Sequence, residues 1–178
     1  MYIKYITYVF VCLLVLYACK PVDDPNIQTK AEQKPKIVET PFDSAAYQWE
    51  GDHILVNWKD LLDVKFVRQP HELLDSADIP QFNEKVKGMH GKKVIIEGFY
   101  IPVEETGDEN IVILSAYPYA QCFFCGQAGV ESIVDILIKE KLPPIKTDTK
   151  VRFSGKFKTN ADDFDFLIYI LEDAKYLK

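Results

Sequence analysis

Residues 93–103 read Lys-Val-Ile-Ile-Glu-Gly-Phe-Tyr-Ile-Pro-Val, and this stretch decides the fold that the sequence predicts. Most of its residues are β-branched, aliphatic or aromatic, which favours an extended strand over a helix. Gly98 stands inside the run, where a glycine is typical of a bulge or a sharp bend. A small barrel needs a strand that bends in this way, so we expect residues 93–103 to form its curved first strand.

Four segments further along the chain complete the expected sheet. Each is a short run of apolar or β-branched residues, as strands usually are. They are residues 111–115, 119–124, 151–157 and 167–171.

A helix is expected between the third and fourth of these five strands. Apolar residues repeat at helical spacing from Val130 to Ile138, and Pro143 follows as a stop signal. One helix between strands 3 and 4 of a five-stranded sheet is the order of an OB-type barrel. The predicted class is therefore mainly β (α+β): a small OB-like five-stranded barrel.

Short helices are expected before the barrel. The segment around Trp58 reads as a short strand or as the entry to a helix that carries Leu61 and Leu62, and residues 80–89 read as a second short helix. Trp58 is expected to anchor the core, because a large aromatic among aliphatic residues usually does.

The N-terminus resembles a secretory targeting signal. Residues 5–18 are uncharged and follow the single basic Lys4, which is the pattern of a secretory signal peptide. The run is shorter than the roughly 20 residues of a membrane-spanning helix. Residues 16–19, Leu-Tyr-Ala-Cys, resemble a bacterial lipobox, so Cys19 is the expected lipid attachment site. A plain signal peptide or an uncleaved anchor is the alternative.

These features predict three parts: a lipoprotein signal peptide at 1–18, a disordered tether at 19–44, and a single OB-like domain at 45–178. The tether is polar and carries prolines, and a flexible stretch of that length spans roughly 25–30 Å on average. A triacylated, palmitate-type anchor on Cys19 would hold the chain on an outer or inner membrane, with the domain outside the cytoplasm, for instance in the periplasm.

The charge of the chain argues against one class of partner. It has 21 Lys and Arg against 27 Asp and Glu, a formal net charge of -6. Nucleic-acid binding needs clustered basic residues on the phosphate backbone, and no such cluster is found. We therefore expect no nucleic-acid partner.

The candidate site is the pair Cys122 and Cys125 in the segment Cys-Phe-Phe-Cys-Gly. The spacing Cys-x-x-Cys is usual for two sulfur ligands of one metal ion such as zinc or copper. His90 is the best candidate for a third ligand. The expected helix would place the pair at its N-terminus, where partial positive charge stabilises thiolate. No catalytic residue is assigned.

Two other uses of the pair stay open. An envelope compartment is oxidising, so Cys122 and Cys125 could serve as a thiol-disulfide redox pair. They could also form a structural disulfide that braces a loop of an interaction protein.

Several segments together resemble an uncharacterised family of bacterial envelope proteins, a domain of unknown function. They are residues 56–61 (Val-Asn-Trp-Lys-Asp-Leu), residues 91–94 leading into 98–104 (Gly-Phe-Tyr-Ile-Pro-Val-Glu), and the approach to Cys122. Many relatives carry Cys-x-His and a proline run where this chain has Cys-Phe-Phe-Cys-Gly. The resemblance implies an envelope location, a persisting pair of metal-type ligands and no established reaction.

The sequence therefore predicts a membrane-anchored envelope lipoprotein and favours a non-enzymatic role without deciding against an enzyme. We expect a binding or accessory role in which Cys122 and Cys125 hold zinc or copper, with an envelope protein or transporter as partner.

Overall fold

The computed structural model describes residues 42–71, 75–102 and 110–177, which belong to one compact unit, Glu39–Lys178. The expected signal peptide, Cys19 and nearly all of the expected tether lie outside the described residues.

Strand β5 (Lys93–Ile101) is the backbone of the sheet and confirms the strand predicted from its sequence. It pairs antiparallel with β8 (Lys150–Thr159) along most of its length. Its other edge has two partners in succession. Strand β2 (His53–Leu55) lies parallel to its first half, and β6 (Ile111–Ser115) lies antiparallel to its second half.

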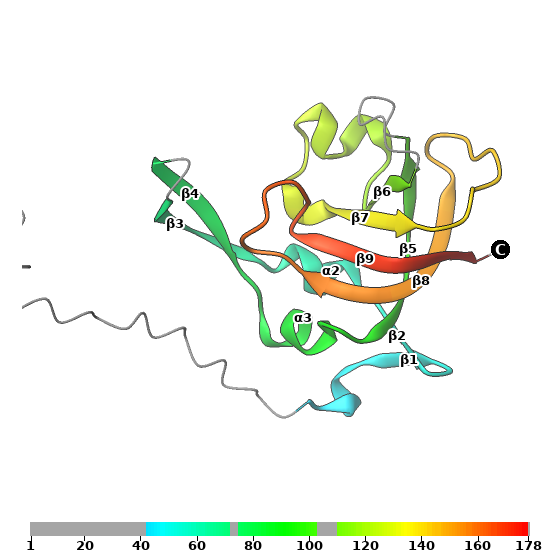
Figure 1. Cartoon of the computed structure of the whole chain (residues 1–178), viewed down its shortest axis with the longest axis horizontal. Helices are drawn as coiled ribbons and strands as arrows, with labels where there is room; N and C mark the ends of the chain where they lie inside the picture. The colour runs from blue at the N-terminus through cyan, green and yellow to red at the C-terminus, as the bar shows by residue number, and fades with distance from the viewer. Residues whose placement is uncertain (1–41, 72–74, 103–109, 178) are drawn as a thin grey trace, which may run out of the picture. The chain divides into compact units, whose positions relative to one another are not determined.

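The main sheet has seven strands in the order β1-β2-β5-β6-β7-β9-β8. The remaining strands are β1 (Gln48–Glu50), β7 (Ile133–Ile138) and β9 (Tyr169–Leu177). Because β8 also pairs with β5, five of the strands curl into a partial ring (Figure 1). The sheet is mixed, since β2–β5 and β7–β9 run parallel. The prediction of a mainly β fold is confirmed, as a partly ringed sheet and not as a barrel.

A second, two-stranded sheet is formed by β3 (Lys65–His71) and β4 (Asp75–Gln81), which extend away from the main sheet in Figure 1. The sequence did not predict this hairpin. Its strands are polar and carry prolines, so they lack the apolar alternation that identifies a half-buried strand.

The helix predicted at residues 130–138 is wrong. A single 3₁₀ turn, η4 (Val130–Ser132), leads directly into β7, and no helix lies between β7 and β8 in the described chain. Five of the six residues of β7 are buried, because the strand is covered on both faces. Such a strand reads as a continuous apolar run, which fits helical spacing by chance. The strand predicted at 119–124 is also wrong, since two 3₁₀ turns occupy it.

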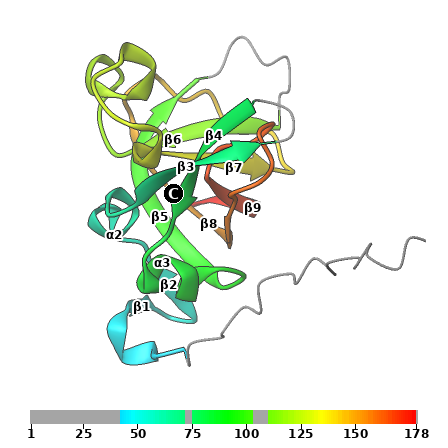
Figure 2. The same cartoon turned by 90° about the vertical axis from the view of Figure 1, so that its left-hand side faces the viewer.

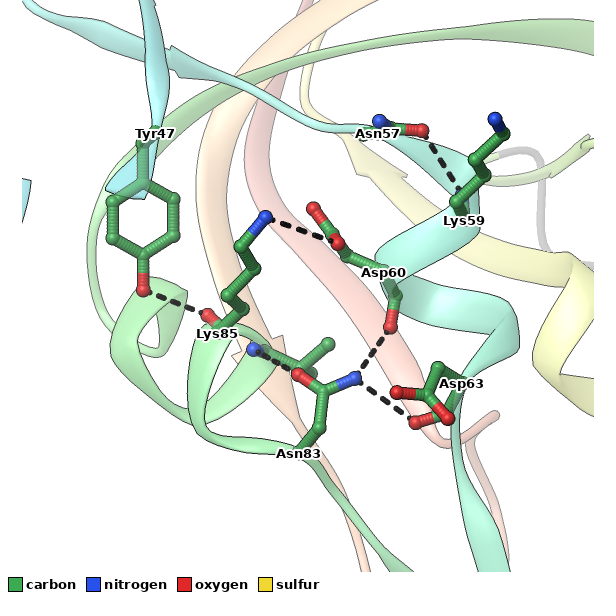
Figure 3. A network of polar contacts seen from close by, with 8 residues as sticks. Tyr47, Asn57, Lys59, Asp60, Asp63, Asn83 and Lys85 are labelled. Atoms are coloured by element: carbon green, nitrogen blue, oxygen red, sulfur yellow. Dashed lines mark hydrogen bonds and ion pairs between the residues drawn. The ribbon is translucent and has the colours of Figure 1, made fainter. Parts of the chain in front are cut away.

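Two short helices precede β5, as expected: α2 (Trp58–Leu62) and α3 (Glu84–Met89). Asn57 caps α2 by accepting a hydrogen bond from the Lys59 backbone, and Asn83 caps α3 in the same way at Val86. The amide of Asn83 also donates to the carbonyls of Asp60 and Asp63, so it joins the two helices (Figure 3). Capping residues with short polar side chains satisfy the free N–H groups of a helix start.

Trp58 fills a gap at the edge of β5. On that edge the carbonyl of Ile95 accepts from Val56, and β6 takes over at Phe99. The carbonyl of Glu97, between them, accepts a 2.6 Å hydrogen bond from Nε1 of Trp58. The indole therefore replaces a strand partner, which a core anchor alone would not do.

Gly98 is required at this junction. A Cβ there would lie 2.6 Å from the Ser115 carbonyl oxygen and 3.1 Å from the Trp58 ring. The register between β5 and β8 continues unbroken through Gly98, so the glycine marks a close approach of neighbours and no bulge.

The buried apolar residues form one main cluster, to which the ringed strands, β2, α2 and α3 contribute, and a smaller one made by Ile101, Ile113 and Ile133. The largest fully buried side chains are Tyr169, Phe153, Phe157, Ile54, Leu61, Met89, Ile96, Ile101, Leu114, Ile133, Ile136 and Leu171. The hydroxyl of Tyr169 donates to the carbonyl of Leu61 at 2.7 Å, which ties the last strand to α2.

Candidate functional site

The candidate site is the segment that connects β6 to β7, residues 116–132, which we call the CxxC loop. It folds as three successive 3₁₀ turns: η2 (Tyr119–Gln121), η3 (Phe123–Cys125) and η4. Figures 1 and 2 both show this loop at the end of the sheet opposite β1 and α3.

The backbone of the loop holds the two cysteines at a tight turn. The carbonyl of Cys122 accepts hydrogen bonds from the N–H groups of Cys125 at 3.2 Å and Gln127 at 3.4 Å. Gly126 ends the turn in the left-handed conformation, with φ of 69°. Cys122 is the extended residue before this turn and Cys125 is its last residue, so the backbone keeps the two cysteines within one turn of each other.

The two thiols differ in exposure. Cys122 is fully buried, Cys125 is exposed, and no bond joins them in the structure. The expected helix N-terminus beside the pair is wrong, because the turns that flank it have only three residues each. A helix dipole therefore contributes nothing to the thiols, since the effect needs several aligned peptide units.

Exposed aromatic rings surround the pair. Phe123 and Phe124 are 38% and 49% exposed and meet edge to face at 5.6 Å between ring centroids. Tyr117 and Tyr119 are also exposed. The backbone of Tyr119 is held by the carboxylate of Asp148 at 2.6 Å. The loop thus presents its rings on a backbone that hydrogen bonds fix.

A hollow of about 520 Å³ lies beside this aromatic group. It is lined by Leu62, Tyr117, Gln121, Gln127, Ala128, Gly129 and Glu131. Three of these side chains, Gln121, Gln127 and Glu131, are polar groups that the sequence did not single out. They have no motif spacing, and only the folding of the loop against the end of α2 brings them together.

His90 is held away from the cysteines. It directly follows α3, and its Nδ1 lies 2.8 Å from the hydroxyl of Thr159 and accepts from the Thr159 backbone. Among residues 42–71, 75–102 and 110–177, no three His, Cys, Asp or Glu side chains form a group able to hold a metal ion. Within the described part of the chain, His90 therefore does not join Cys122 and Cys125 in such a group.

Two buried titratable groups lie near the loop. Burial raises the pKa of Tyr169, and the carboxylates of Glu131 and Asp63 raise it further, so the phenol stays protonated and donates to Leu61. Burial also raises the pKa of Asp135, which stands in β7 and accepts a hydrogen bond from the Leu167 backbone at 2.7 Å. A lone acid within an apolar run was the sequence signal for Asp135.

Comparisons with known proteins give little support for an assignment. No family model matches the chain, and no curated protein matches it. Among solved structures, the chain is similar to a DUF3299 family protein from Pseudomonas aeruginosa PAO1. The sequences are 14% identical, the TM-score is 0.44, and the match covers 72% of this chain and 98% of the other. Within the described residues, no helix is long and apolar enough to cross a membrane.

Proposed function

We propose that this protein is a lipid-anchored envelope protein that binds a thiophilic metal ion, copper or zinc, through Cys122 and Cys125. Its role is that of a non-enzymatic accessory to an envelope protein or transporter. The observation that supports the proposal is the tight turn in which the Cys125 N–H donates to the Cys122 carbonyl, which keeps both cysteines within one turn of a loop at an end of the sheet.

The donor set suits a metal that accepts few protein ligands. Soft thiolates select copper(I) and zinc, and a tetrahedral zinc ion would need further donors from a partner or from water. Cys122 supplies a donor shielded from solvent, and Cys125 one that a partner can reach. The exposed rings of Phe123 and Phe124 offer that partner an apolar contact next to the metal.

Two finer assignments belong to the same proposal. The ring of strands β5-β6-β7-β9-β8, with β7 parallel to β9, follows an OB-type strand order, which supports an OB-like fold. Relation to the envelope family of unknown function is supported by Trp58 and Gly98, which lie in two separate segments of the resemblance and touch across the junction described above. The lipid anchor rests on the sequence around Cys19.

Native mass spectrometry tests the metal site. The chain from residue 20 is exported to an oxidising periplasm and purified without chelator. We expect a mass heavier by one metal ion, which is lost in Cys125→Ser and retained in His90→Ala. A mass lighter by two hydrogens, with no metal after mild reduction and addition of copper(I) or zinc, would refute the proposal.

A thiol-disulfide redox role is the second candidate, and the unequal exposure of the cysteines favours it. An exposed thiol attacks a disulfide and a buried one then resolves the mixed disulfide. This role predicts that Cys122→Ser traps a mixed disulfide on Cys125, which thiol trapping and mass spectrometry would detect. Absence of any mixed disulfide, together with no reduction of a test disulfide by the native chain, would leave only a bracing disulfide as the alternative to metal.

A further inference from the structure

An aromatic cluster stands where the described chain begins. Phe42, Tyr47 and Trp49 form it, and we call it the hairpin cluster because Trp49 belongs to the β1–β2 hairpin. Phe42 stacks on Tyr47 with ring centroids 5.3 Å apart and meets Trp49 edge to face at 6.4 Å. Phe42 and Trp49 remain 40% and 43% exposed. Exposing large aromatic rings to water is unfavourable, and a contiguous exposed apolar patch often marks a binding surface.

The polar atoms of the cluster are already bonded within the protein. Nε1 of Trp49 donates to the carbonyl of Ser44 at 3.0 Å. The hydroxyl of Tyr47 donates to the carbonyl of Lys85 at 2.9 Å (Figure 3), and Tyr47 packs over Gly88, where no Cβ would fit. The rings are therefore fixed in place, and burying them in an apolar medium leaves no donor unpaired.

The charged groups of the hairpin are paired as well. Glu50 bonds to Arg152 at 2.7 Å, and Asp52 bonds to Lys93 at 2.6 Å. Lys92 lies over the Phe42 ring, with Nζ 4.8 Å from its centroid. Such a lysine can keep its ammonium among polar headgroups while its stem follows the apolar surface. The surface around the hairpin cluster therefore has no unpaired acid among the described residues of the hairpin to attract a charged partner, and apolar contact would dominate its binding.

The position of the cluster in the chain selects the partner. It directly follows the segment that joins the domain to the predicted lipid site at Cys19. A flexible segment of that length has a mean span of roughly 25–30 Å. Tethering makes contact with the bilayer intramolecular, so even a weak apolar contact is favoured by a high effective concentration.

We infer that the hairpin cluster inserts into the interface of the membrane that carries the anchor, with Phe42 and Trp49 at the level of the headgroups. This inference rests on the proposed lipid anchor. Tryptophan and tyrosine prefer this layer because each ring has an apolar body and a polar tip. The CxxC loop lies at the other end of the sheet, so membrane contact through the hairpin turns the thiol pair toward the aqueous compartment (Figures 1 and 2).

Quenching of tryptophan fluorescence by brominated lipids tests the inference. The chain from residue 20 is held on zwitterionic phosphatidylcholine vesicles by an N-terminal His tag bound to a nickel-chelating lipid, which replaces the natural anchor. The chain has two tryptophans, Trp49 and Trp58, so Trp49→Phe isolates the emission of Trp58. We expect brominated acyl chains to reduce the Trp49 emission at least about twofold, and to leave Trp49→Phe nearly unchanged, because Trp58 is partly buried beside β5.

A matched control places the reporter at the opposite end. Trp49→Phe combined with Phe124→Trp puts the reporter at an exposed position of the CxxC loop, where the native Phe124 is 49% exposed against 43% for Trp49, and we expect no quenching of it. Quenching of Trp49 no stronger than that of this control would overturn the inference. The expected quenching persists from about 0.1 M to about 1 M salt, where the Debye length falls from about 10 Å to about 3 Å. Its loss at high salt would show electrostatic adsorption and also contradict the inference.

The lipid anchor is tested separately. Labelling of the native chain with a palmitate analogue, and loss of the label in Cys19→Ser, measures lipidation without reference to Trp49. Lipid labelling without quenching of Trp49 would support the lipid anchor and contradict membrane insertion of the hairpin cluster. Quenching of Trp49 without lipid labelling would support membrane insertion of the hairpin cluster and contradict lipidation at Cys19.

Discussion

The hairpin cluster and the CxxC loop expose similar aromatic surfaces at opposite ends of one sheet, yet their polar groups differ. In the hairpin cluster, the indole N–H and the phenol hydroxyl are bonded to nearby carbonyls, and the acids are paired. The CxxC loop instead surrounds its rings with an exposed thiol and a hollow lined by Gln121, Gln127 and Glu131. Exposed aromatic area alone thus does not name a partner. The chemistry of the neighbouring polar groups decides between a lipid surface and a ligand with its own donors.

The strand that joins the two ends gives the largest expected effect. Gly98→Ala would place a methyl group 2.6 Å from the Ser115 carbonyl and 2.8 Å from Leu114, in a packed junction. We expect a loss of about 3 kcal/mol or more in the free energy of unfolding, at the upper end of overpacking costs. Urea denaturation followed by circular dichroism measures it.

Two glycines at the ends are the controls for this prediction. Gly51 and Gly126 have positive φ, and a Cβ on either would meet open space. Alanine there should cost only about 1–2 kcal/mol, through backbone strain. Equal losses at all three positions would show that the junction at Gly98 is not special.

The two cysteines should differ in the next largest effect. Cys122→Ser buries a hydroxyl in a site that holds a fully buried thiol, and we expect a loss of about 1–3 kcal/mol in unfolding free energy. Cys125→Ser changes an exposed group and should stay within about 0.5 kcal/mol. Alkylation kinetics add a second measure, because Cys125 should react in the native state and Cys122 only after unfolding. Equal rates would contradict the geometry of the CxxC loop.

One pH dependence should come from Asp135, which stands in β7 just after the CxxC loop. Burial raises the pKa of Asp135 above its unfolded value, so the folded state holds its proton more tightly. The stability due to this group is full below the unfolded pKa and is lost as pH rises through the folded pKa. We therefore expect the stability of Asp135→Asn, relative to the native chain, to increase as pH rises from about 3 to 7.

Urea unfolding at the two ends of that pH range gives the measurement. The native chain also contains exposed acids, such as Asp52 and Asp78, whose pKa values are lowered by ion pairs, so only the difference between variant and native chain isolates Asp135. If the difference in unfolding free energy between Asp135→Asn and the native chain does not change with pH, then Asp135 is not the group that titrates.

The smallest effect compares the exposed rings themselves. Phe124→Ser should change the free energy of unfolding by less than about 0.5 kcal/mol, because surface substitutions usually do. Trp49→Ser should cost somewhat more, about 1 kcal/mol, since it also removes the hydrogen bond to Ser44. A large loss from either variant would mean that the ring supports the fold and is not held out for a partner.

Strands with an unambiguous composition were predictable. β5 and β6 follow their β-branched runs, and α3 lies within the helix predicted at residues 80–89. α2 was one of two alternatives for the segment around Trp58. β7 was not predictable, because a strand buried on both faces carries no alternation, and its apolar positions match a helix equally well. The sequence motif identified the pair of cysteines in the candidate site. The hollow beside them was not predicted, because the residues that line it have no characteristic spacing in the sequence.

The sequence by itself determined the strand-rich class, the strand at residues 93–101, the pair at Cys122 and Cys125, and the expectation of an anchor at Cys19. These follow from composition and short-range spacing, which act within a few residues. Only the tertiary structure decided that Trp58 completes the edge of β5 and that Cys122 is buried while Cys125 is exposed. It also decided that α3, which His90 directly follows, lies at the end of the sheet opposite the CxxC loop. Each depends on which distant strands pair, and pairing is set by the burial of the whole apolar core and not by any local segment.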